Sequence, residues 1–66
     1  MLSVEIGHTA GKVWNFLEKN GASTINKLKK SIDANSDMVL FAIGWLARED
    51  KVKFEKKGRA TLISLK

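Results

Sequence analysis

The side chains with the clearest capacity for chemistry are cations gathered at one end of the chain. Residues 51–66 carry six lysines and arginines and a single acidic residue, Glu55, whereas residues 1–50 carry six cations and six acids. The whole net charge of +5 therefore lies in the last part of the chain. This asymmetry indicates an anionic partner, and it is equally compatible with a solubilising segment on a small domain.

Cations on an exposed turn suit phosphate groups, because Lys and Arg neutralise the backbone charge of DNA and release its counterions. Such contacts do not depend on base sequence, so any binding of duplex DNA is expected to be weak and non-specific. Four of the cations lie in or beside a predicted turn, and three others lie on predicted helices. The predicted nucleic-acid-binding residues are Lys53, Lys56, Lys57, Arg59, Lys27, Lys30 and Arg48.

The residue patterns of catalytic and metal sites are missing from the sequence. It contains no cysteine, and its single histidine, His8, has no cluster of carboxylates around it. A Gly-rich phosphate loop and a Ser-centred elbow motif are also missing. We therefore expect neither an enzyme nor a protein with a metal, a cofactor or a small-molecule substrate, and we expect His8 on the surface.

The length of 66 residues predicts a single domain spanning residues 1–66. A domain of this size buries only about 60% of the surface that its unfolded chain exposes, so it must pack efficiently or associate. No stretch approaches the roughly 18 apolar residues of a membrane span, and the first residues lack the pattern of a secretory signal. We expect a cytoplasmic protein without membrane contact.

Two helices are predicted in the first half of the chain by apolar residues at helical spacing. The first is marked by Ile6, Ala10, Val13, Trp14 and Leu17, and the Asn20-Gly21 pair ends it. The second begins after Thr24, a predicted N-cap, and is marked by Ile25, Leu28 and Ile32. A turn over residues 33–35 follows.

A third helix and a hairpin are predicted in the second half. Ser36 is the predicted N-cap of a helix from about Asp37 to Glu49, with Asp50 or Lys51 as its exit. Two alternating strands then flank a turn over residues 56–59, which pairs Phe54 with Thr61 and Val52 with Ile63. This register places Val52, Phe54, Ile63 and Leu65 on one half-buried face.

This order of elements resembles the winged helix-turn-helix fold, a small α+β fold with three helices and a two-stranded antiparallel wing. The segments Ala10–Leu17 and Leu40–Glu49 are similar to those of a family of bacterial and archaeal winged-helix domains of unknown function. The similarity covers nearly the whole chain. It implies the fold, and it implies no catalytic residue, ligand or settled activity.

The third helix carries two apolar faces. At about 100° per residue, its core stripe consists of Val39, Ala42, Ile43 and Leu46. The opposite face, which in a DNA-reading winged helix offers polar groups to base edges, instead consists of Leu40, Phe41, Gly44, Trp45 and Arg48. The sequence therefore disfavours base reading by this helix.

Two explanations of the second apolar face remain open. Leu40, Phe41, Gly44 and Trp45 form an interface with a second copy or with another protein, or else Trp45 folds back over the first helix while Phe41 packs under the second. Two functions follow. In the first, the domain contacts nucleic-acid backbone through its basic wing, as a transcription-regulator-like protein. In the second, it is a protein-interaction or homodimerisation module with no nucleic-acid role.

Overall fold

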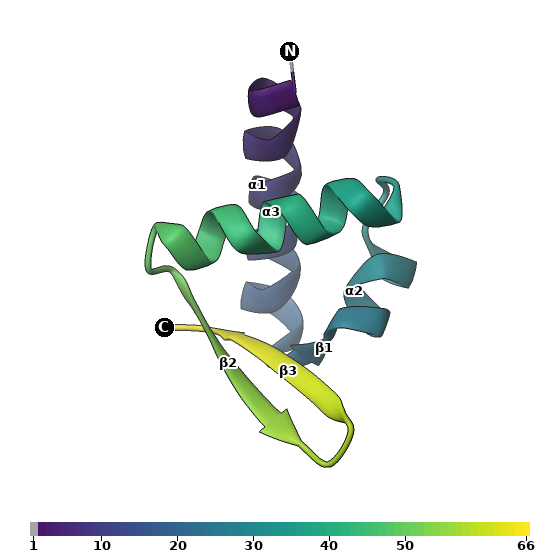
Figure 1. Cartoon of the computed structure of the whole chain (residues 1–66), viewed down its shortest axis with the longest axis vertical. Helices are drawn as coiled ribbons and strands as arrows, with labels where there is room; N and C mark the ends of the chain where they lie inside the picture. The colour runs from purple at the N-terminus through teal and green to yellow at the C-terminus, as the bar shows by residue number, and fades with distance from the viewer. Residues whose placement is uncertain (1) are drawn as a thin grey trace.

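Three helices and three short strands make up the computed structural model, which describes residues 2–66 (Figure 1). In chain order they are α1 (Leu2–Asn20), β1 (Ser23–Thr24), α2 (Ile25–Ser31), α3 (Ser36–Arg48), β2 (Val52–Lys57) and β3 (Ala60–Leu65). Helix α3 crosses in front of α1 in Figure 1, α2 lies to one side, and the β2–β3 hairpin projects below. The three predicted helices are confirmed.

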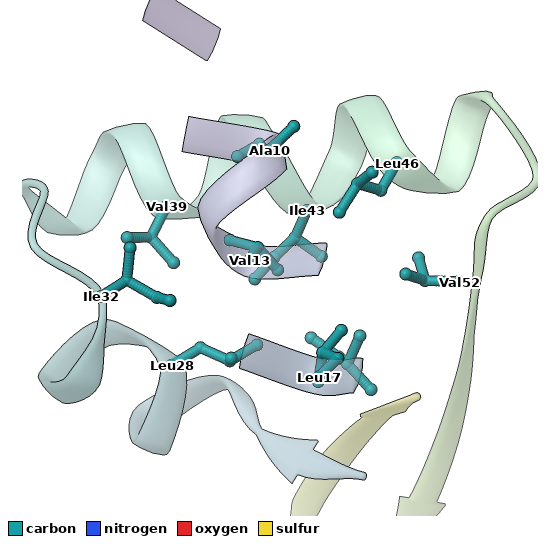
Figure 2. Close-up of a cluster of buried hydrophobic side chains, with 11 residues drawn as sticks. Ala10, Val13, Leu17, Leu28, Ile32, Val39, Ile43, Leu46 and Val52 are labelled. Atoms are coloured by element: carbon teal, nitrogen blue, oxygen red, sulfur yellow. The ribbon is translucent and has the colours of Figure 1, made fainter. Parts of the chain in front are cut away.

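The core lies where the helices meet the base of the hairpin (Figure 2). Val13 of α1, Leu28 of α2 and Val39 of α3 are fully buried, because the apolar stripe of each helix turns toward the other two. Val52 and Ile63 bring the sheet into the same cluster. The stripes predicted from helical spacing therefore form one continuous core, with Trp14 and Ile25 partly buried at its margin and Ile6 outside it.

One of the two N-caps predicted from residue type is confirmed, and the other is shifted by one residue. Thr24 is the N-cap of α2, as predicted, and its Oγ1 accepts a hydrogen bond of 3.1 Å from the backbone N–H of Lys27. The predicted cap of α3, Ser36, is wrong: Asn35 takes this position, and its Oδ1 accepts from the N–H of Met38 at 2.8 Å. Asn and Ser are equally good caps, so residue type did not decide between neighbours.

The end of α3 shows why the chain turns sharply into the wing. The N–H of Asp50 donates to Ala47 O and that of Lys51 to Leu46 O, a pair of bonds typical of a Schellman motif. Asp50 occupies the left-handed position of this motif, with a φ of 59°. The predicted exit at Asp50 or Lys51 is confirmed.

The wing is three-stranded, which corrects the predicted two-stranded hairpin. Strand β1 pairs antiparallel with β3, giving the order β1-β3-β2, with Ser23 opposite Ile63 and Thr24 opposite Leu62. Two residues cannot show the alternation by which a strand is recognised, and Thr24 also serves as a helix cap. The additional strand joins the hairpin to the start of α2.

The predicted hairpin register is also wrong, by two residues. Phe54 pairs with Ile63 and Val52 with Leu65, which leaves Gly58 and Arg59 as the two-residue turn. Gly58 has a φ of 60° and Arg59 is not in the left-handed region, a pattern typical of a type II′ turn with glycine first. Because side chains alternate with a period of two, the shift keeps the predicted set of four residues on one face.

Candidate nucleic-acid and protein interfaces

The cations of the hairpin lie on a segment that extends beyond the core. Lys53, Lys56, Lys57 and Arg59 are all exposed, as expected for residues on or near the hairpin tip. Their cross-strand partners are uncharged, since Lys56 is opposite Thr61 and Lys57 opposite Ala60. The tip is therefore a small basic surface, which we call the wing tip and define as Lys56, Lys57 and Arg59.

Strand alternation divides these cations between the two faces of the sheet. Lys53 and Lys57 lie on the outer face with Glu55 between them, whereas Lys56 lies on the same face as Phe54. Glu55 offsets part of the charge on the outer face. The positive charge is consequently densest at the turn, where the two faces meet.

Acidic partners do not neutralise the wing tip. Across residues 2–66, the one ion pair joins Lys66 Nζ to Asp50 Oδ1, at the opposite end of the hairpin. The carboxylate of Glu55 makes no ion pair with its lysine neighbours in that part of the chain. The cations of the wing tip are thus available to an anion in solution.

The other predicted cations do not extend this surface into one patch. Lys27 and Lys30 of α2 are exposed on one side of the helix, and Lys27 borders a hollow of about 350 Å³ beside Leu62 on the outer face of the sheet. Arg48 is exposed at the end of α3, which lies across the molecule from α2 (Figure 1). The seven cations therefore form separate clusters.

The second apolar face of α3 is exposed, in agreement with its place opposite the core stripe. Leu40 is 40% exposed, Phe41 51% and Trp45 44%, whereas the four residues of the core stripe are buried. Gly44 and Arg48 are also exposed. We call this surface the α3 face and define it as Asp37, Leu40, Phe41, Gly44, Trp45 and Arg48.

The aromatic side chains of the α3 face pack back onto the domain only in part. Trp45 lines a hollow of about 280 Å³ between α3 and α1, together with Gly7, Gly11 and Trp14. It nevertheless keeps nearly half of its surface in contact with solvent, as does Phe41. The chain therefore does not cover the α3 face by itself.

Gly44 lies in the centre of the α3 face, and neither packing within the chain nor backbone conformation requires glycine at this position. A Cβ placed on Gly44 would meet no atom of the described residues within 4 Å, and its φ is an ordinary helical one. Glycine lowers helix propensity by about 1 kcal/mol relative to alanine. The single chain gains nothing from this glycine.

Sequence reasoning missed one exposed aromatic residue. Phe54 was expected on a half-buried face, and its side chain is 50% exposed because the hairpin leaves the core at this point. The alternation of the strand identifies the face of Phe54 but not how far along the hairpin the helices reach. His8 is exposed, as predicted.

Metal-binding clusters and membrane-spanning helices do not occur within the described residues. Residues 2–66 contain no group of three His, Asp or Glu side chains placed to hold a metal ion. Within the same residues, no helix has the length and apolar character required to cross a bilayer.

Comparisons with known proteins agree on the fold. A family described as a winged helix-turn-helix domain (DUF2582) matches residues 1–65. The uncharacterized protein MJ1608 of Methanocaldococcus jannaschii is 44% identical over 64 residues, which cover 94% of this chain and 91% of that protein.

Two solved structures are similar to this one. Protein BT2368 from Bacteroides thetaiotaomicron has a TM-score of 0.88 and 34% identity, over 98% of this chain and 79% of that chain. AF1382 from Archaeoglobus fulgidus has a TM-score of 0.65 and 18% identity, over 94% of this chain and 65% of that one. The second likeness shows the fold alone.

Proposed function

Because the chain belongs to this family of winged helix-turn-helix domains of unknown function, we propose that it binds duplex DNA through the phosphate backbone, with the wing tip as the contact. The observation that carries the proposal is the exposed, unpaired cluster of Lys56, Lys57 and Arg59 at the end of the hairpin. Its role is that of a regulator-like protein that contacts DNA without reading its sequence.

The composition of α3 supports backbone contact over base reading. Specific contacts in the major groove require side chains that donate or accept hydrogen bonds at base edges. The α3 face offers Leu40, Phe41 and Trp45 in their place, and Asp37 at its start repels phosphate. Binding through the wing tip avoids these side chains.

The expected affinity is low and depends on salt. Neutralising a phosphate on duplex DNA makes log K fall by about 0.9 per unit of log salt concentration, so three cations give a slope near −2.7. Non-specific complexes of this type have a Kd of about 10⁻⁴ to 10⁻⁶ M at physiological salt. Binding is therefore to be sought at low ionic strength.

An NMR titration with a generic duplex of mixed sequence tests the proposal. At about 50 mM salt, the amide shifts should concentrate in residues 53–59 and should shrink when salt is raised fourfold. The variant Lys56→Gln/Lys57→Gln/Arg59→Gln should lose these shifts. Equal, weak binding by the variant and the parent would refute the nucleic-acid proposal.

A matched control separates the wing tip from overall charge. Lys12→Gln/Lys19→Gln/Lys51→Gln removes the same three charges from positions outside the hairpin tip. The proposal expects this control to bind much as the parent does. A loss equal to that of the wing-tip variant would assign the binding to net charge instead.

A second candidate function is supported by the α3 face. A contiguous exposed patch that contains two aromatic side chains is typical of a protein-interaction surface. In this alternative the domain is an interaction or homodimerisation module, and its wing has no nucleic-acid role. The alternative would be favoured by a titration without shifts at low salt.

A further inference from the structure

We infer that the α3 face is covered by the α3 face of a second copy of this chain, with the two helices antiparallel about a two-fold axis between residues 42 and 43. The inference rests on the exposed α3 face that supports the second candidate function, and it names the partner of that face. It does not require that the wing bind DNA, so the two proposals can fail separately.

The charges at the two ends of the face are self-complementary. Asp37 and Arg48 lie on the same side of α3, within about 20° of one another at 100° per residue. They are also equally distant from the midpoint between residues 42 and 43. The two-fold axis therefore brings each Asp37 opposite Arg48 of the second copy, twice in one interface.

A parallel arrangement has the opposite consequence. It would place Asp37 beside Asp37 of the second copy and Arg48 beside Arg48, so that like charges meet at both ends. The charge pattern of the face thus selects the antiparallel arrangement. It also argues against a partner of unrelated sequence, since both halves of each ion pair are present on this one helix.

The large and small residues of the face match under the same axis. Phe41 and Trp45 lie on one side of the face, at nearly equal distances from the midpoint, so Phe41 meets Trp45 of the second copy. Leu40 and Gly44 lie on the other side and meet in the same way. The interface therefore contains two aromatic pairs between the copies, and in it the leucine of each copy packs against the glycine of the other.

Two features of the single chain fit this packing. Gly44 has open space around it and no role within the chain, whereas close approach by Leu40 of a second copy needs a position without a side chain. The hollow lined by Gly7, Gly11 and Trp45 opens on the aromatic side of the face. It offers room beside the incoming Phe41.

The size of the face predicts a reversible dimer. At about half exposure, three large side chains of roughly 150–250 Å² each leave on the order of 300 Å² of apolar surface. Stable interfaces bury about 800 Å² per partner. We therefore expect the mass in solution to rise from one chain to two between micromolar and millimolar concentrations.

Charge exchange tests both the partner and its direction. Asp37→Arg and Arg48→Asp each place like charges at both ends of the antiparallel interface, so each variant loses two ion pairs. An exposed ion pair is worth up to about a factor of five in Kd, so each variant should weaken dimerisation on the order of tenfold. The double variant Asp37→Arg/Arg48→Asp should restore the parent Kd. An equimolar mixture of the two single variants should form a heterodimer.

Sedimentation equilibrium measures these masses, and two phenylalanine variants supply a matched control. Phe41→Ser should abolish the dimer, whereas Phe54→Ser should not, although the two side chains are 51% and 50% exposed. Circular dichroism should show the helix content of every variant unchanged at micromolar concentration.

Three results would overturn the inference. The first is a parent chain that remains monomeric at millimolar concentration. The second is a dimer that Phe54→Ser disrupts and Phe41→Ser does not. The third is a dimer whose single charge variants have the parent Kd, or whose double variant and mixture fail to recover it. None of these measurements contains DNA, so they leave the wing-tip proposal to its own titration.

Discussion

Phe54 and Ile63 are cross-strand partners on the same face of the hairpin, yet Ile63 is fully buried and Phe54 is 50% exposed. The boundary of the core therefore passes between two paired residues. On one side of β3, β1 pairs with it, with Ser23 opposite Ile63, and α1 and α2 pack against β3. On the other side, β2 is an edge strand of the sheet. The basic residues of the wing tip come after Phe54 along the chain, beyond the core.

Replacing these two partners by alanine should have unequal effects. Ile63→Ala creates a cavity in the core and should lower the free energy of unfolding by about 2–5 kcal/mol. Phe54→Ala should lower it by about 1 kcal/mol, since only half of the larger side chain leaves water. Urea denaturation measures both values. An equal or greater loss for Phe54 would contradict the boundary of the core.

The N-cap of α3 provides a second comparison between neighbours. Asn35→Ala removes the acceptor of the Met38 N–H and should cost about 1 kcal/mol of stability. Ser36→Ala should change the free energy of unfolding by only a few tenths, since Ser36 is the first residue of the helix. Thermal unfolding followed by circular dichroism distinguishes them. A larger effect at Ser36 would restore it as the cap.

The spacing of apolar residues predicts the faces of the helices and strands, but not which residues pair across the hairpin. The stripes of the three helices and the place of Leu40, Phe41 and Trp45 opposite the core stripe were predictable, because each depends only on a spacing of about 3.6 residues. Spacing left open whether the rest of the domain covers that second face. The hairpin face was predictable for the same reason with a spacing of two. The hairpin register was not, because a shift of two residues leaves the pattern of faces unchanged.

Other features depend on local geometry that the residue pattern does not contain. Strand β1 is too short to alternate, and its presence follows from the pairing of Ser23 and Thr24 with β3. The distance between α2 and the end of α3 follows from tertiary packing, which divides the cations that the sequence grouped together.

Asp50 holds a backbone conformation that glycine adopts more easily. Its φ of 59° lies in the left-handed region, which costs a residue with a Cβ about 1–2 kcal/mol. Asp50→Gly should therefore be more stable than Asp50→Ala by about 1 kcal/mol in urea denaturation, because both variants lose the exposed ion pair with Lys66. Equal stability of the two would contradict the strained exit.

The salt dependence of DNA binding should identify the contacting cations. The parent should show a slope of log K against log salt near −2.7, and neutralising Lys56, Lys57 and Arg59 should bring it close to zero. Fluorescence anisotropy with a labelled duplex measures the slope between about 25 and 200 mM salt. The control that lacks Lys12, Lys19 and Lys51 should keep most of the slope. If both variants flatten it equally, the wing tip is not the contact.

Gly44 and Gly58 should respond in opposite directions to the same change. Both have open space for a Cβ, but Gly44 is helical whereas Gly58 has a φ of 60°. Gly44→Ala should raise the free energy of unfolding by about 0.5–1 kcal/mol, and Gly58→Ala should lower it by about 1 kcal/mol or more. The measurement belongs at micromolar concentration, where the single chain is observed. A loss at Gly44 would mean that the helix needs this glycine within the chain. A higher free energy of unfolding for Gly44→Ala would show that alanine stabilises the monomer. Close approach by another helix would then remain as the reason for glycine at this position.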